Sequence, residues 1–434
     1  MKKLFALAMT LFCMLSFCTV HAEETQYKLD QVVILSRHHI RSPLSGSGSM
    51  LERITPHTWF EWTSRPSELS LRGAVLETMM GQYFRLWMES ENLIPENYRP
   101  GENEVRIHAN SLQRTIATSR CFSAGLLPVA NIPVEYHAEY DTMDPTFSTA
   151  VTFVTDAYVR DATAQIAQQG GTDDLRGIHA RVKDAIALLM EVTDMRESED
   201  YQSGVFGDLL SDVTEMIFKE GKEPFMIGFV GTASSIADAL TLQYYEEPDE
   251  KKAAFGHEIS EKEWRQIHSI VDAYIDALYG AHLVAVNVAH PLLQELRSEL
   301  KAEGRKITYL CGHDANLASV LSAMNVEPYL LPETLEQHTP IGSKLVFEKW
   351  LDESGEAWYR VCMVYQSTQQ LRNMIQLSMD NPPVVYPLDF KGVAAAEDGM
   401  IPEKELLDRL DDAIAEYDEM VEQYTEDEVK QEAA

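Results

Sequence analysis

The segment VVILSRHHIRSP, residues 32–43, indicates the fold of this chain more clearly than any other stretch. Its first four residues are apolar and mostly β-branched, which is typical of a strand buried on both faces of a parallel sheet. A loop rich in Arg and His follows the strand directly. Because ligands of open α/β sheets gather beyond the carboxyl ends of the strands, this loop lies where a functional site is expected.

The rest of the chain supports an α/β fold, because strands alternate with helices on both sides of a long helical region. We predict a mostly parallel sheet with its helices, formed by residues 23–149 and 261–434, and a smaller, mainly helical cap domain, formed by residues 150–260. The predicted elements are a helix from the N-cap Ser70 to about Glu91, a strand at 105–108, a helix through Ala124, helices at 178–193 and 233–246, a strand at 306–311, an antiparallel hairpin of 344–350 and 358–366, and an acidic amphipathic helix after Pro402.

Composition restricts the class of ligand. The 434 residues include 36 Lys and Arg against 69 Asp and Glu, which gives a formal net charge of −33. Such acidity argues against nucleic acid and anionic membrane surfaces as partners, since both attract basic proteins. An anionic ligand would therefore need positive charge that is concentrated at its site.

The first 22 residues have the pattern of a secretory signal peptide, with two lysines, an apolar run to Cys18 and small residues before two glutamates. Cleavage after Ala22 would place the protein in the periplasm or outside the cell. A lipid anchor on Cys18 is the less favoured alternative, because Phe17 is large for the position before a lipidated cysteine. No later stretch reaches the roughly 20 apolar residues of a membrane-spanning helix.

The cysteines left after cleavage are odd in number, which forbids a fully paired disulfide framework, and they are Cys121, Cys311 and Cys362.

The loop after the first strand places cations around an imidazole. Arg37 and Arg41 flank His38, and Pro43 stiffens the end of the loop. Arginine matches the oxygens of a phosphoryl group, and a nucleophilic histidine needs a neutral ring nitrogen aimed at phosphorus while cations hold those oxygens. The alternative is a structural histidine beside two solubilising arginines.

A second segment, Gly312-His313-Asp314, favours the catalytic interpretation, because it directly follows the predicted strand at 306–311. His313 would donate a hydrogen bond to the charge that develops on phosphorus, and Asp314 would protonate the departing alkoxide. Asp314 must then be protonated when substrate binds, which predicts an acidic pH optimum or a raised pKa. Arg114 would add a third guanidinium at a helix N-terminus, where phosphate is already favoured.

Together these residues resemble the histidine acid phosphatases, branch two of the histidine phosphatase superfamily, and the resemblance covers nearly the whole mature chain. Five further segments are similar to the periplasmic glucose-1-phosphatase subgroup: ANSLQRT at 109–115, TMDPTF at 142–147, TLQYY at 241–245, HTPIG at 338–342 and QLRN at 370–373. The resemblance implies an α/β domain with a largely helical second domain and a site in the cleft between them. It implies His38 as the phosphorylated nucleophile, Asp314 as the general acid, and Arg37, Arg41, Arg114 and His313 as the groups that bind the phosphoryl group.

The resemblance further implies a metal-independent phosphatase for small phosphate monoesters that uses no cofactor, with glucose 1-phosphate or a related sugar phosphate as substrate. A phytase-type inositol polyphosphate phosphatase is one alternative. A non-catalytic sugar-phosphate-binding protein is another, although such a protein has no need of His38 or Asp314. His39, where the family usually has glycine, and Glu223, which would repel additional phosphates if it faced the cleft, are candidates for substrate specificity.

No metal centre is predicted. No His-x-His or His-Glu-x-x-His spacing is present, adjacent His38 and His39 would point to opposite sides of an extended segment, and other histidines such as His108 and His137 are scattered.

Overall fold

The computed structural model describes residues 27–432 except 47, 206, 208 and 211–213, so the predicted signal peptide lies outside the described residues. An eight-stranded sheet forms the centre, in the order β10-β8-β7-β1-β6-β2-β3, with β9 paired to β8. Its strands are β1 (Lys28–Arg37), β2 (Val105–Ala109), β3 (Val134–Glu135), β6 (Ile307–Gly312), β7 (Lys344–Leu351), β8 (Ala357–Tyr365), β9 (Val384–Pro387) and β10 (Ile401–Pro402).

Strand β1 lies where the parallel and antiparallel parts of the sheet meet. It is parallel to β6, β6 is parallel to β2, and β2 is parallel to β3. On its other side β1 is antiparallel to β7, and β7 forms the predicted hairpin with β8. The predicted α/β class is confirmed, and the parallel strands are those that carry the expected site.

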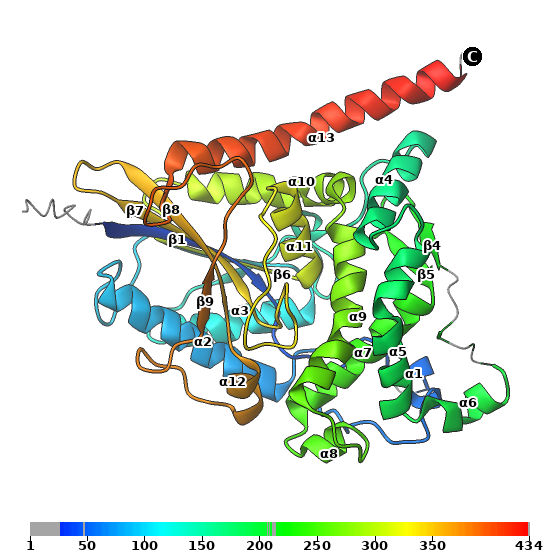
Figure 1. Ribbon diagram of the computed structural model, residues 1–434. Helices are drawn as coiled ribbons and strands as arrows, with labels where there is room; N and C mark the ends of the chain where they lie inside the picture. The colour runs from blue at the N-terminus through cyan, green and yellow to red at the C-terminus, as the bar shows by residue number, and fades with distance from the viewer. Residues whose placement is uncertain (1–26, 47, 206, 208, 211–213, 433–434) are drawn as a thin grey trace, which may run out of the picture.

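Helices cover both faces of this sheet (Figure 1). The helices are α1 (Met50–Arg53), α2 (Leu71–Ser90), α3 (Gln113–Leu126), α4 (Asp156–Gln169), α5 (Arg176–Val192), α6 (Glu199–Gln202), α7 (Phe229–Glu246), α8 (Glu250–Ala253), α9 (Glu261–Tyr279), α10 (His282–Leu300), α11 (Asp314–Ala323), α12 (Thr368–Asn373) and α13 (Glu403–Glu432). Val33 and Leu35 pack in the core that includes α10 and α13, whereas Val32 and Ile34 pack in the core that includes α2 and α3. Both faces of β1 are therefore buried, which explains its continuous apolar run.

Several local predictions are confirmed. Ser70 caps α2, because its side chain accepts a hydrogen bond from the backbone N–H of Gly73. The predicted strands and helices at 105–108, 178–193, 233–246 and 306–311 correspond to β2, α5, α7 and β6. Cys121, Cys311 and Cys362 are free.

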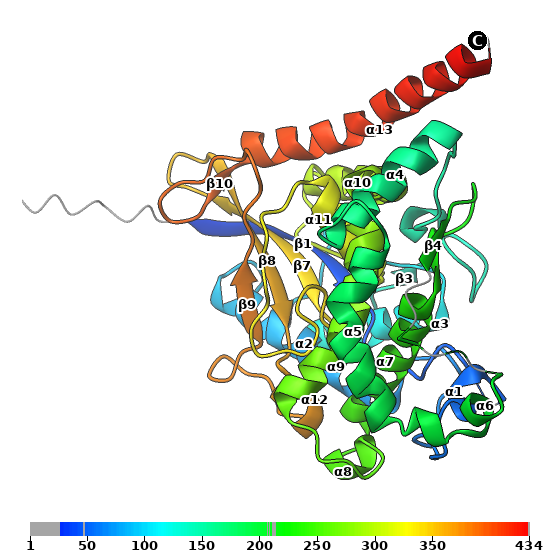
Figure 2. The ribbon, with the colours of Figure 1, turned by 45° about the vertical axis from the view of Figure 1, so that its right-hand side comes forward.

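The region between 150 and 260 is mainly helical, and α5, α7 and α9 pack against one another beside the sheet (Figure 2). It also contains a hairpin of β4 (Thr214–Ile217) and β5 (Phe225–Gly228), which was not predicted. Each strand has only four residues, too few for an alternating pattern to be recognised. Among the described residues no single helix has the length and apolarity to cross a membrane, although α9 and α10, joined at an 81° bend, meet that test as a pair.

Candidate active site

The carboxyl ends of three adjacent parallel strands meet at one edge of the sheet. Arg37, the last residue of β1, is paired with Gly312, the last residue of β6, and Ala109 at the end of β2 is paired with Cys311. The loops that leave these ends are held by further backbone bonds. His38 N donates to the Gly312 carbonyl at 3.0 Å, and this bond places the first and second predicted motifs side by side.

The N-terminal end of α2 packs against the loop that follows β1. Ser70 N donates to the Ile40 carbonyl at 2.9 Å, and a Cβ atom at Gly73 would lie 2.3 Å from the same carbonyl oxygen. Only glycine therefore permits this close approach of helix and loop. The predicted nucleophile sits on a backbone with little freedom to move.

A cleft of about 560 Å³ opens above these strand ends. The cleft is lined by His38, Arg41, Arg114, His313 and Asp314, by Glu223 and Asp238 from the 150–260 region, and by Tyr274 of α9, among others. Five of the six residues predicted to perform the chemistry thus line one cavity, and the sixth, Arg37, is buried and pairs with Asp314, which lines it.

His38 is held in a defined tautomer. Its Nδ1 lies 2.9 Å from the carbonyl oxygen of His39, which can only accept a hydrogen bond. The proton therefore resides on Nδ1, and the Nε2 lone pair is free. Burial, followed by the nearby Arg114 and His313, lowers the pKa of His38 well below its usual value. The ring is consequently neutral in mildly acidic solution, as a nucleophile requires.

The three arginines differ in their partners. Arg37 forms ion pairs with Asp314 at 3.0 Å and with Glu336 at 3.3 Å, and Arg41 pairs with Asp238 at 3.1 Å. Within the described part of the chain, Arg114 has no carboxylate within ion-pair distance. Its burial, and then the neighbouring Arg41, lower its pKa to about 10.

Unused hydrogen-bonding capacity indicates an anion site. The Nε atoms of Arg37, Arg41 and Arg114 are buried and have no hydrogen-bond partner among the described residues. Buried donors normally find an acceptor, and Arg41 and Arg114 line the cavity while Arg37 pairs with Asp314 at its edge, so this group of guanidinium groups fits an anionic ligand with several oxygens.

Asp314 begins α11 and is ionised in the absence of substrate. Its Oδ2 pairs with Arg37 Nη2 at 3.0 Å, and its Oδ1 accepts a hydrogen bond from Ala315 N at 2.8 Å. Burial raises the pKa of Asp314, but Arg37 and then His313 outweigh burial, so that the pKa is lowered. The prediction that the pKa of Asp314 is raised is therefore wrong for the substrate-free protein. The other prediction, an acidic pH optimum for turnover, remains.

His313 is positioned by an amide that sequence reasoning did not assign to a role. Asn110 Oδ1 accepts from Asp144 N at 2.9 Å, which turns Asn110 Nδ2 towards His313 Nε2 at 2.6 Å. The ring of His313 also lies edge-to-face with His38, at 5.4 Å between centroids. The two imidazoles are thus fixed relative to each other.

The two candidate specificity residues have different positions. His39 is fully buried beneath the loop, where its Nε2 lies 3.1 Å from Gln366 Oε1, and it does not line the cleft. Its role in substrate specificity stays a prediction, and because its side chain does not reach the cavity it could act on the substrate only through the residues that it packs against. Glu223 does line the cleft, is exposed, and accepts a hydrogen bond from Thr149 Oγ1 at 2.8 Å.

Sequence reasoning missed the carboxylates that orient the arginines. Asp238 lies on α7 and Glu336 in the loop before β7, each far along the chain from its arginine. Glu336 also accepts a hydrogen bond from Ile341 N at 2.5 Å, which fixes it beneath Arg37. A single acidic residue in a chain with 69 of them carries no local signal, so only the folded structure identifies these two.

Comparison with known proteins agrees with this geometry. Residues 28–366 match the histidine phosphatase superfamily (branch 2). The chain is 34 % identical to a glucose-1-phosphatase of Providencia rettgeri over 377 residues, covering 86 % of this chain and 88 % of that protein. It is also 34 % identical to a glucose-1-phosphatase of Salmonella typhimurium over 419 residues, covering 95 % and 98 %. The apo structure of Hafnia alvei phytase superposes with a TM-score of 0.81 at 26 % identity, covering 89 % of this chain and 97 % of that one.

The chain therefore belongs to branch 2 of the histidine phosphatase superfamily. It is a histidine acid phosphatase, a hydrolase of phosphate monoesters, as the sequence resemblance predicted.

Proposed function

We propose that this phosphatase acts on small sugar monophosphates, glucose 1-phosphate foremost, through a phosphohistidine at His38. The observation that supports the proposal most strongly is the state of His38. A neutral imidazole with a free Nε2 lone pair lies in a cleft whose buried arginines have unused N–H donors. This combination is what transfer of a phosphoryl group to nitrogen requires.

In the first step, Arg37, Arg41, Arg114 and His313 hold the phosphoryl oxygens. His38 Nε2 attacks phosphorus, the bond from phosphorus to the sugar oxygen breaks, and that oxygen takes the proton of Asp314. In the second step, water attacks the phosphorus of phosphohistidine and gives a proton to the Asp314 carboxylate. The bond between nitrogen and phosphorus breaks, which releases inorganic phosphate and restores neutral His38 and protonated Asp314.

Substrate binding itself supplies the protonated form of Asp314. In the free protein Arg37 pairs with Asp314 and holds its pKa down. A phosphoryl group that occupies Arg37 adds negative charge next to Asp314 and competes for the guanidinium, and both effects raise the pKa of the carboxyl group. We therefore expect turnover to be fastest in acidic solution and to fall as the pH rises.

The proposed substrate class rests on charge at the cleft as well as on the relatives. Glu223 and Asp238 both line the cavity, and Asp238 is paired with Arg41. A ligand with one phosphate places its charge among the arginines, whereas a polyphosphorylated inositol would bring further charge towards Glu223. Phytase activity is therefore expected to be limited.

The nucleophile is tested with a radiolabelled phosphate ester. Rapid quenching should trap an acid-labile, base-stable phosphoprotein in the wild type and none in His38→Ala, which should also lose turnover. His39→Gln, which alters a buried neighbour outside the cleft, is the matched control and should still be labelled. Wild-type turnover in His38→Ala would refute the assignment.

The general acid is tested by the leaving group. Asp314→Asn should slow hydrolysis of glucose 1-phosphate by about 10²–10⁴-fold, whereas p-nitrophenyl phosphate, whose leaving group scarcely needs a proton, should be affected far less. Equal losses for both substrates would remove Asp314 from this role.

The substrate is tested by kcat/KM for glucose 1-phosphate and for phytate at one acidic pH and low salt. The wild type should prefer glucose 1-phosphate, and Glu223→Gln should narrow that preference. Glu220→Gln, an exposed substitution in the same segment that does not line the cleft, is the control. A wild-type preference for phytate would overturn the substrate proposal, and an unchanged ratio in Glu223→Gln would exclude this residue as its cause.

A further inference from the structure

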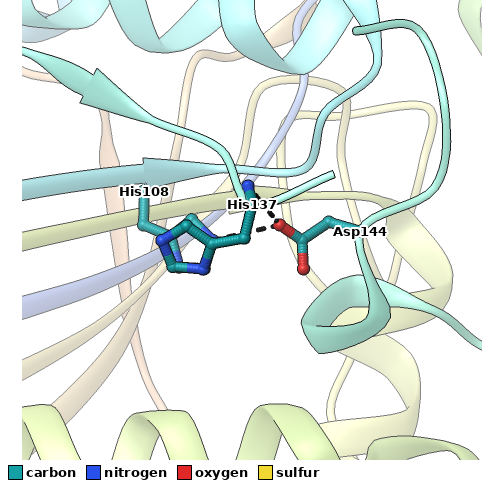
Figure 3. A group of neighbouring side chains, drawn as sticks. All are labelled: His108, His137 and Asp144. Carbon is teal, nitrogen blue, oxygen red and sulfur yellow. Dashed lines mark hydrogen bonds and ion pairs between the residues drawn. The ribbon is translucent and has the colours of Figure 1, made fainter. Parts of the chain in front are cut away.

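Three side chains outside the cleft come together although the sequence separates them. His108 lies on β2, His137 follows β3, and Asp144 precedes the short helix at Pro145–Phe147 (Figure 3). A ligand atom of each lies within 4.8 Å of a ligand atom of both others. None of the three lines the phosphatase cleft.

The spacing between His108 and Asp144 is informative. His108 Nε2 and Asp144 Oδ2 are 3.4 Å apart, which is long for a hydrogen bond between a charged donor and acceptor, about 2.7–2.9 Å. With bonds of about 2.0–2.2 Å and tetrahedral angles, two ligand atoms of one zinc ion lie roughly 3.3–3.5 Å apart. The two side chains therefore have the separation of metal ligands without any rearrangement.

The surrounding contacts are those that orient metal ligands. His108 Nδ1 lies 3.2 Å from Glu295 Oε1, so a carboxylate holds the ring from the side opposite Asp144. The second nitrogen of a metal-binding histidine usually bonds to a carboxylate, a backbone carbonyl or a water, and here it faces a carboxylate. Asp144 is fixed by backbone N–H groups, since its Oδ1 accepts from Thr146 N and its Oδ2 from His137 N, each at 2.9 Å.

His137 supplies both a third ligand and access from solvent. Its side chain is 51 % exposed, whereas those of His108 and Asp144 are almost fully buried. Its ring lies over that of His108, at 4.1 Å between centroids and 32° between the ring planes, and Figure 3 shows the Asp144 carboxylate bonded to the backbone N of His137, so rotation of the exposed side chain would aim one of its ring nitrogens at the ion. An ion from solvent can therefore reach the buried pair past the exposed ring.

We propose that His108, His137 and Asp144 form a binding site for a divalent transition-metal ion, with Zn²⁺ as the best match. Two imidazoles and one carboxylate are a ligand set that Zn²⁺ accepts, and water would complete the tetrahedron. The role is structural, because the ion would join β2 to the loop between β3 and the 145–147 helix.

The same loop supports the phosphatase site. Asp144 N donates to Asn110 Oδ1, and Asn110 Nδ2 contacts His313 Nε2. A metal that holds Asp144 would therefore stabilise the loop that carries this contact, which is a contribution to folding stability and not to the chemical step. The alternative is that a protonated His108 bridges Asp144 and Glu295, an arrangement that needs no metal.

The test is metal binding by the full chain without a histidine tag, after removal of metals with a chelator and dialysis. Calorimetry with ZnCl₂ should show one site per chain, and CoCl₂ should produce the visible absorption bands of tetrahedral Co²⁺. Zn²⁺ should also raise the melting temperature. His137→Ala, at an exposed position where misfolding is not expected, should weaken Zn²⁺ binding at least tenfold and abolish the Co²⁺ bands.

The matched control is His257→Ala. His57 and His257 both contact Asp194 Oδ2, at 2.7 and 3.1 Å, so they form a second His-His-Asp group elsewhere in the fold. The wild-type Zn²⁺ affinity should persist in this variant. Absence of Zn²⁺ binding by the wild type, or equal affinity in His137→Ala, would overturn the proposal and favour the protonated bridge. Neither readout depends on catalysis, so the outcome is independent of the proposed function.

Discussion

His39, the residue after the proposed nucleophile, should limit the stability of this protein in acid. Its Nδ1 accepts from Ile40 N at 2.9 Å, so Nε2 carries the proton and donates to Gln366 Oε1. Burial, and then the charge of Lys344, lower the pKa of His39 to about 3. The folded protein therefore keeps this ring neutral in solutions where an unfolded chain would protonate it.

The size of the effect follows from that difference. An unfolded histidine has a pKa of about 6.5, so between about pH 6.5 and pH 4 the unfolded state gains a proton that folded His39 does not. Because the folded pKa is lowered, this contribution to stability is present at neutral pH and is lost on acidification. At about 1.4 kcal/mol per pH unit, the loss at pH 4 is roughly 3 kcal/mol.

The assay is urea unfolding of the wild type and His39→Gln near pH 7 and near pH 4, followed by tryptophan fluorescence. Glutamine can still donate to Gln366 but does not replace the acceptor for Ile40, so the variant should be less stable at neutral pH by about 1–3 kcal/mol. Its additional loss on acidification should be roughly 3 kcal/mol smaller than that of the wild type.

Equal acid-induced losses in the two proteins would refute this account of His39. His268 offers an independent repeat, since burial, followed by Arg37, lowers its pKa to about 3 as well. His268→Gln should therefore remove a similar part of the pH dependence, roughly 3 kcal/mol at pH 4.

Three further outcomes are expected. Arg114→Ala removes the guanidinium that has no ion-pair partner in the described part of the chain, so kcat/KM should fall by about 10–150-fold, the value of a charged hydrogen bond, while thermal unfolding shows little or no loss of stability. Glu77→Gln leaves the fully buried Lys344, 3.0 Å away, without its counter-charge, and should lower the free energy of unfolding in urea by about 3–5 kcal/mol. The double variant Glu77→Leu/Lys344→Met should recover most of that loss, and wild-type stability of Glu77→Gln would contradict the prediction. A chelator should leave the rate of phosphate release unchanged, because every proposed catalytic group is a side chain of the protein; a loss of activity that added Zn²⁺ restores would assign the metal a part in turnover.

Much of the candidate site could be located from the sequence, because its residues follow strands that are recognisable locally. The run at 32–35 is apolar throughout because both faces of β1 are covered, and this pattern is visible before any contact is known. Parallel strands end at a common edge, so Arg37, His38 and Arg41 after one strand and His313 and Asp314 after another had to lie close together.

Tertiary structure alone decided which of these side chains are ion-paired and which of them face the cleft. Arg37 and Arg41 have carboxylate partners, whereas Arg114 has none among the residues that the structure describes, a difference set by Glu336 and Asp238, which come from distant segments. Side-chain direction likewise depends on packing, which is why His38 faces the cleft and adjacent His39 is buried beneath it. The amino-acid sequence determined which strands form and which chemical groups follow them, because hydrophobic patterns and turns act over a few residues. The folded chain decided which charges are paired and which scattered residues meet, as at His108, His137 and Asp144, because those contacts join segments whose separation leaves no local pattern.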